Sequence, residues 1–188
     1  MSWIVIVLVL LAAFGPILWL LPSRTDRRLA AMRARARARG IHVEITRLPD
    51  LDADATARVT AGGKRVEPTI SCAAYHLAMH REARAAPQWK LLRRRDATDP
   101  LDGWQWDSPR VEDANYWQEV AAVVRELPAD ALACAADARE TICWWRERVA
   151  AEHAESSVDR LADLLNKLAE IQKLAHERAT AEAEDEDR

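Results

Sequence analysis

Three side chains that could bind a metal recur at a spacing of four residues: Cys72, His76 and His80. On a helix they would share one face, where a thiolate and two imidazoles could hold zinc. On a strand they also share a face, but eight residues at about 3.3 Å each would place Cys72 roughly 26 Å from His80. Large apolar residues alternate along 69–79, which favours a strand, while the alanine content leaves a helix as the alternative. We therefore predict no metal ligands.

A second pattern, at Asp50, Asp52 and Asp54, has the spacing of the first ligands of a calcium-binding loop. Such a loop needs a glycine at its sixth position and a glutamate at its twelfth. Here those positions are occupied by Ala55 and Ala61. We read the segment as an ordinary acidic loop.

No other local motif in the sequence indicates an enzymatic reaction. The sequence has no phosphate-binding loop, dinucleotide fingerprint, nucleophile elbow, HExxH motif or CxxC pair. Catalytic groups can converge from distant parts of a chain, so a membrane-tethered enzyme of unknown chemistry is kept as the alternative. The leading prediction is a non-catalytic protein with no catalytic residues and no cofactor.

The stretch from Trp3 to Leu21 contains nineteen residues without a charge, hydroxyl or amide side chain. As a helix it would be about 28 Å long, close to the hydrocarbon thickness of a bilayer. Trp3 and Trp19 lie near its ends, where indole rings favour the headgroup level. We predict a transmembrane helix at residues 3–21. A cleaved signal peptide is the alternative, but no basic residue precedes the apolar run.

A basic segment, residues 22–40, follows the apolar stretch and is rich in alanine, which favours a helix ending at Gly40. Its arginines predict that the N-terminus lies outside and the remaining chain in the cytoplasm, as a single-pass protein of the bacterial inner membrane. They also predict contact with the bilayer and its anionic lipid headgroups; a topology signal alone is the alternative. These membrane-interface arginines are Arg24, Arg27, Arg28, Arg33, Arg35, Arg37 and Arg39.

Charge and cysteine content narrow the function classes further. The net charge is −3, and basic and acidic residues are segregated at opposite ends, so we expect no nucleic-acid partner. The acidic end, residues 182–188, is predicted to be disordered. Three cysteines without close spacing are typical of reduced thiols in a reducing compartment.

Residues 41–181 predict one cytoplasmic α+β domain with a mostly antiparallel sheet, a middle helix and a long C-terminal helix. Asp113 is expected to cap the middle helix and Ser156 the last one, whose leucine stripe should dock on the sheet, with dimerisation as the alternative. The predicted strands are 41–49, 58–60, 69–79, 88–92 and 103–106, and the predicted helices are 112–127 and 158–181.

Residues 131–148 allow either one alanine-rich helix or a β-hairpin. Alanines favour the helix, but the β-branched and aromatic run from Thr141 to Trp145 favours strands. We predict a hairpin with its turn at Ala138-Arg139, which places Cys134 directly opposite Cys143. The turn lacks Asn-Gly and is flanked by two acidic residues, which disfavours it.

Two tryptophans, Trp104 and Trp106, are separated by one residue and should point to the same side of a short strand. They are the candidate partner surface of the domain. The alternative is that both rings cover the core of the sheet.

The N-terminal layout resembles YajC, the small accessory subunit of the bacterial preprotein translocase. The resemblance rests on the apolar span, the sequence Leu21-Pro22-Ser23-Arg24-Thr25-Asp26-Arg27-Arg28, the basic helix and the β-rich segment after it. It covers roughly the first 65 residues, and the longer whole resembles a family of proteobacterial single-pass membrane proteins grouped under that name. It implies association with the translocase and transfers no functional residue. The expected function is a membrane-anchored adaptor or accessory subunit with a membrane-protein partner.

Overall fold

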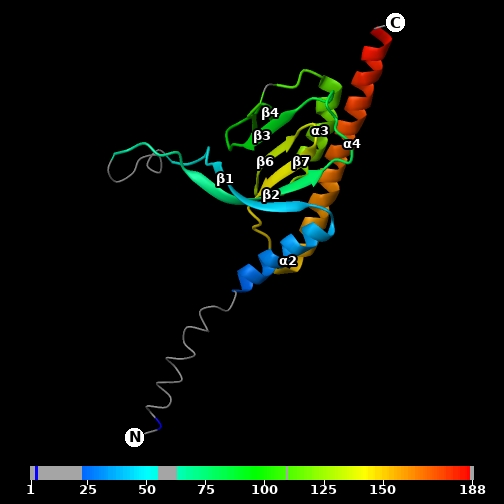
Figure 1. Ribbon diagram of the computed structural model, residues 1–188. Helices are drawn as coiled ribbons and strands as arrows, with labels where there is room; N and C mark the ends of the chain where they lie inside the picture. Colours follow the sequence, from blue (N-terminus) through cyan, green and yellow to red (C-terminus); the bar gives the residue numbers. More distant parts are fainter. Residues whose placement is uncertain (1–2, 4–22, 55–62, 109, 187–188) are drawn as a thin grey trace.

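One antiparallel sheet of seven strands forms the frame of the protein, as Figure 1 shows. The computed structural model describes residues 3, 23–54, 63–108 and 110–186. The predicted α+β class, antiparallel sheet, middle helix and long C-terminal helix are confirmed. The elements in chain order are α2 (Arg24–Ala38), β1 (His42–Pro49), β2 (Thr69–Ala78), β3 (Trp89–Arg93), β4 (Pro100–Leu101), β5 (Trp104–Trp106), α3 (Ala114–Arg125), β6 (Ala131–Ala136), β7 (Glu140–Trp145), a short 3₁₀ helix (Ala151–His153) and α4 (Ala154–Glu186).

The strand order is β1-β2-β7-β6-β3-β5-β4, so the last hairpin in sequence lies at the centre of the sheet. The β6–β7 hairpin is inserted between β2 and β3, and every pairing is antiparallel. Its central position fits its composition, because nearly all the side chains of β6 are buried and are small or apolar. Four of the six residues of β6 are alanines, all of them buried.

The predicted hairpin is confirmed, and Cys134 pairs directly with Cys143. The Asp137 carboxylate accepts hydrogen bonds from the backbone N–H groups of Arg139 (2.7 Å) and Glu140 (2.9 Å). This Asx-type arrangement closes the turn without the Asn-Gly pair. The second acidic residue, Glu140, lies 3.1 Å from Nδ1 of His76 on the neighbouring strand. Both acidic residues thus have local roles in the hairpin.

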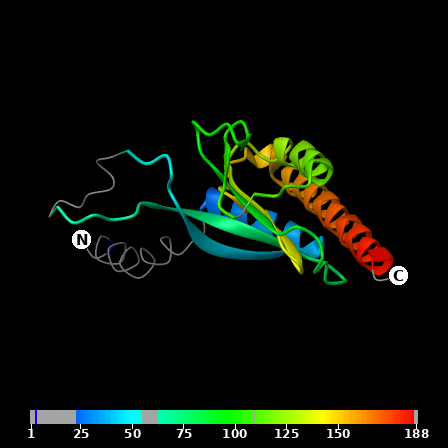
Figure 2. The ribbon, with the colours of Figure 1, turned by 90° about the horizontal axis from the view of Figure 1, so that it is seen from above.

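The helices lie on one face of the sheet, as seen in Figure 2. The leucine stripe of α4 is buried against this face as far as Leu168, which confirms docking on the sheet, whereas Leu174 at the end of the predicted stripe is exposed. The docked leucines are Leu161, Leu164, Leu165 and Leu168. Asp113 caps α3 as predicted, with its carboxylate accepting from the N–H groups of Asn115 and Tyr116.

A buried polar cluster joins α3 and α4 to the sheet. The indole N–H of Trp89 donates to the hydroxyl of Tyr116 (2.6 Å), which donates to the Gln172 carbonyl (2.6 Å). The Gln172 amide donates to the backbone carbonyls of Pro87 (3.1 Å) and Asp137 (3.3 Å). Gln172 is fully buried, and these hydrogen bonds connect α4 to three separate segments.

Both predicted ends of the last helix are wrong. Helix α4 begins at Ala154, and the Ser156 hydroxyl donates to the His153 carbonyl instead of capping the helix. The helix continues through Glu186, so residues 182–186 are helical where the sequence predicted a disordered tail. Good helix formers such as alanine and glutamate fill this segment, which explains its continuation.

Two predictions fall on residues that the structure does not describe. Of the predicted transmembrane stretch, Trp3 alone belongs to the described residues, and the predicted strand 58–60 lies outside them. Among the helices of the described part, none is long and apolar enough to cross a bilayer.

Candidate functional site

The basic helix α2 is fastened to the domain through a buried carboxylate. Arg33 donates two hydrogen bonds to Glu147, from Nε at 3.1 Å and from a terminal nitrogen at 2.5 Å. The Tyr75 hydroxyl donates to the same carboxylate at 2.9 Å. Glu147 is 3 % exposed and has a φ of 57°, a left-handed conformation that is uncommon for a side-chain-bearing residue. The hydrogen-bonded carboxylate holds the chain in this conformation.

The protonation states in this cluster follow from its geometry. Burial first, and the nearby Glu147 charge second, raise the pKa of Tyr75, so the phenol stays neutral and donates. The hydrogen bond to Glu147 raises the pKa of Arg33. The cluster therefore contains one cation, one anion and one neutral donor, which together satisfy a buried ion pair.

Further ion pairs extend the attachment of α2 along α4. Arg35 binds both carboxylate oxygens of Asp159 at 2.9 Å, and Arg39 binds Asp163. Arg28 donates to the backbone carbonyl of Val149. We call these contacts, together with Arg33–Glu147–Tyr75, the α2 clamp.

The arginines that the sequence assigned to the membrane interface fall into two groups: those with partners inside the protein and those that are exposed. Arg33, Arg35 and Arg39 are in intramolecular ion pairs, and Arg28 and Arg37 donate to backbone carbonyls. Arg24 and Arg27 are exposed and form no ion pair within the described part of the chain. Trp3 is exposed, and Trp19 lies outside the described residues. The sequence analysis did not identify Glu147 as a functional residue. The one local signal for it is that this acidic residue lies between two arginines in the sequence.

The two tryptophans proposed as a partner surface lie on the core side of the sheet. Trp104 is 2 % exposed, and the Arg93 guanidinium covers its ring at 4.3 Å from the centroid. Trp106 is half-buried, with its ring 4.6 Å from that of Trp117 on α3. Helix α3 thus contributes the Trp117 ring as an apolar cover for Trp106. The partner-surface prediction therefore does not fit Trp104, which is part of the core.

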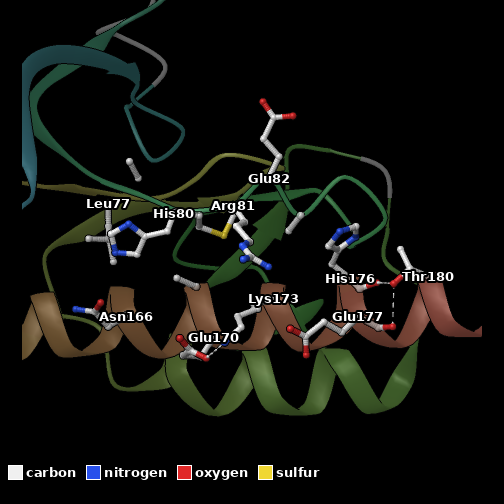
Figure 3. Close-up of a pocket in the computed structure, with 14 residues that line it drawn as sticks. Leu77, His80, Arg81, Glu82, Asn166, Glu170, Lys173, His176, Glu177 and Thr180 are labelled. Atoms are coloured by element: carbon white, nitrogen blue, oxygen red, sulfur yellow. Dashed lines mark hydrogen bonds and ion pairs between the residues drawn. The ribbon is translucent and has the colours of Figure 1, made fainter.

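A groove that the sequence did not predict lies between α4 and the chain that follows β2 (Figure 3). It has a volume of about 600 Å³, within the range of ligand-binding clefts. Apolar side chains from both walls line it, and charged side chains surround them. The apolar set is Leu77, Met79, Ala83 and Ala169, and the charged set is Arg81, Glu82, Glu170, Lys173 and Glu177.

Several polar groups of the groove already have structural partners. The backbone N–H of Ala85 donates to Nδ1 of His176 at 3.2 Å, and the Thr180 hydroxyl donates to carbonyls of its own helix. Lys173 lies 3.5 Å from Glu170. Such an arrangement is suited to holding apolar side chains between charged walls.

No protein-family model, no curated protein and no solved structure matches this chain.

Proposed function

We propose that this protein is a membrane-anchored, non-catalytic adaptor or accessory subunit of the bacterial inner membrane. The apolar stretch at residues 3–21 would span the bilayer, and the α+β domain would stand in the cytoplasm. The observation that carries the proposal is the α2 clamp, because it fixes the helix next to the anchor onto the domain. A flexible linker would leave the domain free to rotate beneath the membrane.

Helix α2 has its own capped start directly after the predicted span. Ser23 and Asp26 form a capping box, in which the Ser23 hydroxyl accepts from the Asp26 N–H (3.1 Å) and the Asp26 carboxylate accepts from the Ser23 N–H (3.0 Å). The hydrogen bond from the Ser23 hydroxyl to the Asp26 carboxylate (2.7 Å), followed by the one from the Ser23 N–H, lowers the pKa of Asp26. Helix α2 therefore begins three residues beyond the predicted span, and the arginines nearest the bilayer would be Arg24 and Arg27.

The groove supplies the surface for a partner. Asp159 in the clamp and Lys173 in the groove are fourteen residues apart on α4, which is about 21 Å along a helix. A rigid domain would thus hold the groove at a set distance from the membrane. We propose that the groove receives an apolar segment of a membrane-protein partner. The preprotein translocase is the first partner to test because of the N-terminal resemblance.

The partner proposal can be tested by site-specific photo-cross-linking in intact cells. A photoreactive residue at Met79, in the groove, should cross-link to a membrane protein that mass spectrometry identifies. The matched control is Leu174, which is 42 % exposed and lies outside the groove. Equal cross-linking from both positions, or none from Met79, would contradict the groove as the partner site. Cross-links to proteins outside the translocase would remove that complex as the partner.

The anchor and its orientation need a separate test. A reporter that is active only in the periplasm, fused after Arg188, should be silent, and a cytoplasmic reporter there should be active. Intact-mass measurement should show the N-terminal residues retained, apart from removal of Met1. Strong periplasmic activity, or a mature chain beginning near Ser23, would refute the proposed anchor and orientation.

A further inference from the structure

Three arginines converge on a second cavity, at the end of the sheet where β1, β3 and β7 finish and β2 and β6 begin. The cavity has a volume of about 400 Å³ and is distinct from the groove. Its arginines are Arg93, Arg95 and Arg146, and its apolar wall consists of Leu51, Ile70, Leu92 and Leu132. Neither the adaptor proposal nor the α2 clamp uses this cavity.

Arg93 has a structural role. Its Nε donates to the Ala131 carbonyl at 2.8 Å, a terminal nitrogen donates to the Pro128 carbonyl at 3.4 Å, and its plane covers Trp104. Burial lowers the pKa of Arg93, but a guanidinium stays charged at any physiological pH. Arg93 therefore contributes positive potential to the cavity, and two of its five donors bind backbone carbonyls.

Arg146 differs from Arg93 because its Nε has no acceptor in the described part of the chain. Its Nε is buried and has no hydrogen-bond partner among the described residues, and its side chain forms no ion pair with them. A buried donor on a cation that lacks an acceptor is costly, so native structures rarely keep one without a reason. An acceptor supplied by a ligand in the cavity would satisfy it.

Three aspartates also line the cavity, and each already accepts hydrogen bonds from neutral donors. Asp130 accepts from the Trp145 indole (2.6 Å) and the Arg148 N–H (2.8 Å). Asp52 accepts from the Arg95 N–H at 3.0 Å, and Asp50 from the Asp52 N–H at 3.2 Å. A carboxylate has about four acceptor positions, so each can still receive a further donor. The cavity thus offers cationic donors, anionic acceptors and an apolar wall together.

We propose that this cavity binds a free apolar α-amino acid. The ligand carboxylate would receive the Arg146 fork, and its ammonium group would donate to Asp50 or Asp52. The side chain would contact the wall of Leu51, Ile70, Leu92 and Leu132. Three arginines balanced by three aspartates favour a zwitterion over a phosphate, whose double charge the aspartates would repel. The volume suits a ligand of this size.

The test is calorimetric titration of the full chain in mild detergent. The probes are L-leucine, 4-methylpentanoate, which lacks the ammonium group, 3-methylbutylamine, which lacks the carboxylate, and inorganic phosphate. L-Leucine should bind, and each analogue should bind at least tenfold more weakly because one charged contact is lost. Arg146→Gln should weaken leucine binding at least tenfold, and Arg146→Lys should have a smaller effect because the charge is kept and the fork is lost.

The matched control is Arg148→Gln, an exposed arginine two residues away whose side chain does not line the cavity. It should bind leucine like the parent chain. Circular dichroism and the melting temperature of each variant show whether the fold is kept, and Arg146→Lys keeps the test valid if Arg146→Gln fails to fold. Binding of inorganic phosphate in place of leucine, binding of 4-methylpentanoate as tight as leucine, or no binding of any probe would overturn the proposal.

Discussion

Arg33 and Glu147 are 114 residues apart in the sequence, yet the guanidinium of one forms two hydrogen bonds with the carboxylate of the other. The Glu147 side chain is 4 % exposed and that of Arg33 28 %, so the ion pair is buried on the domain side and reaches solvent on the helix side. This pair ties the segment next to the predicted anchor to the end of the central strand β7. Among the ion pairs of the α2 clamp, it is the one with the most buried carboxylate.

Breaking this pair should destabilise the domain. Arg33→Met leaves the Glu147 carboxylate buried with Tyr75 as its remaining partner, and we expect a loss of about 3 kcal/mol in the free energy of unfolding, the low end for a broken buried pair. Denaturant unfolding followed by circular dichroism measures this. Arg37→Met is the control, because Arg37 donates to a backbone carbonyl on the helix surface, and should cost below about 0.5 kcal/mol. Equal effects of both substitutions would show that the pair contributes nothing.

The buried cluster around Gln172 gives a second prediction. Gln172→Leu keeps the side-chain size but leaves the carbonyls of Pro87 and Asp137 without their donor and removes the acceptor of the Tyr116 hydroxyl. We expect a loss of about 2–3 kcal/mol, since each unsatisfied buried group costs about 1–3 kcal/mol. Lys173→Leu, at the next and exposed position, should change stability little. A stability of Gln172→Leu equal to the parent would mean that water replaces the lost hydrogen bonds.

The paired thiols of the hairpin should be inert in the folded protein. Burial raises the pKa of Cys134 to about 12 and that of Cys143 well above its usual range. At pH 8 the thiolate fraction of Cys134 would be about 10⁻⁴, and the thiolate is the reactive form. Iodoacetamide should therefore modify both thiols at the rate of unfolding, as mass spectrometry of the alkylated peptides can follow. Rapid labelling without denaturant would contradict the buried hairpin.

The same pair gives a geometric test of the strand register. In the Cys72→Ser variant, an oxidant added under partly denaturing conditions and then removed with the denaturant should leave a Cys134–Cys143 bond. Directly opposed residues have Cβ atoms about 4.5–5.5 Å apart, near the spacing a disulfide needs. The bonded chain should recover the circular dichroism of the reduced chain. Loss of that spectrum in the bonded chain would contradict direct opposition of the two residues.

Acid should weaken the α2 clamp through Asp159. The hydrogen bond from Arg35 lowers the pKa of Asp159 in the folded state below the value of an unfolded aspartate, near 3.9. Its stabilising effect is therefore present above about pH 4 and is lost as pH falls through the lowered folded pKa. Asp159→Asn should flatten the decrease in stability below about pH 4, measured by melting temperature against pH. Asp102→Asn, at an exposed loop carboxylate, should leave that decrease unchanged, and equal curves for Asp159→Asn and the parent would refute this role.

Local patterns in the sequence determined the elements and some of their pairings. Period-two alternation predicted β1 and β2, short apolar and aromatic runs predicted β3 and β5, and the leucine stripe predicted the docked face of α4. The register of the hairpin, with Cys134 opposite Cys143, also followed from sequence, because a two-residue turn fixes which residues oppose each other. In each case the determining residues lie within a few positions of one another.

Tertiary structure alone decided where those elements meet. The insertion of the β6–β7 hairpin between β2 and β3 depends on contacts between strands distant in sequence, for which no local pattern exists. The arginines of α2 predicted a basic helix, but their partners Glu147 and Asp159 are brought to them by the fold. The fold likewise brings Arg146 and three aspartates from distant parts of the chain to one cavity. The sequence gives the type of each side chain directly. The group that pairs with its charge depends on which distant segments pack against it in the fold.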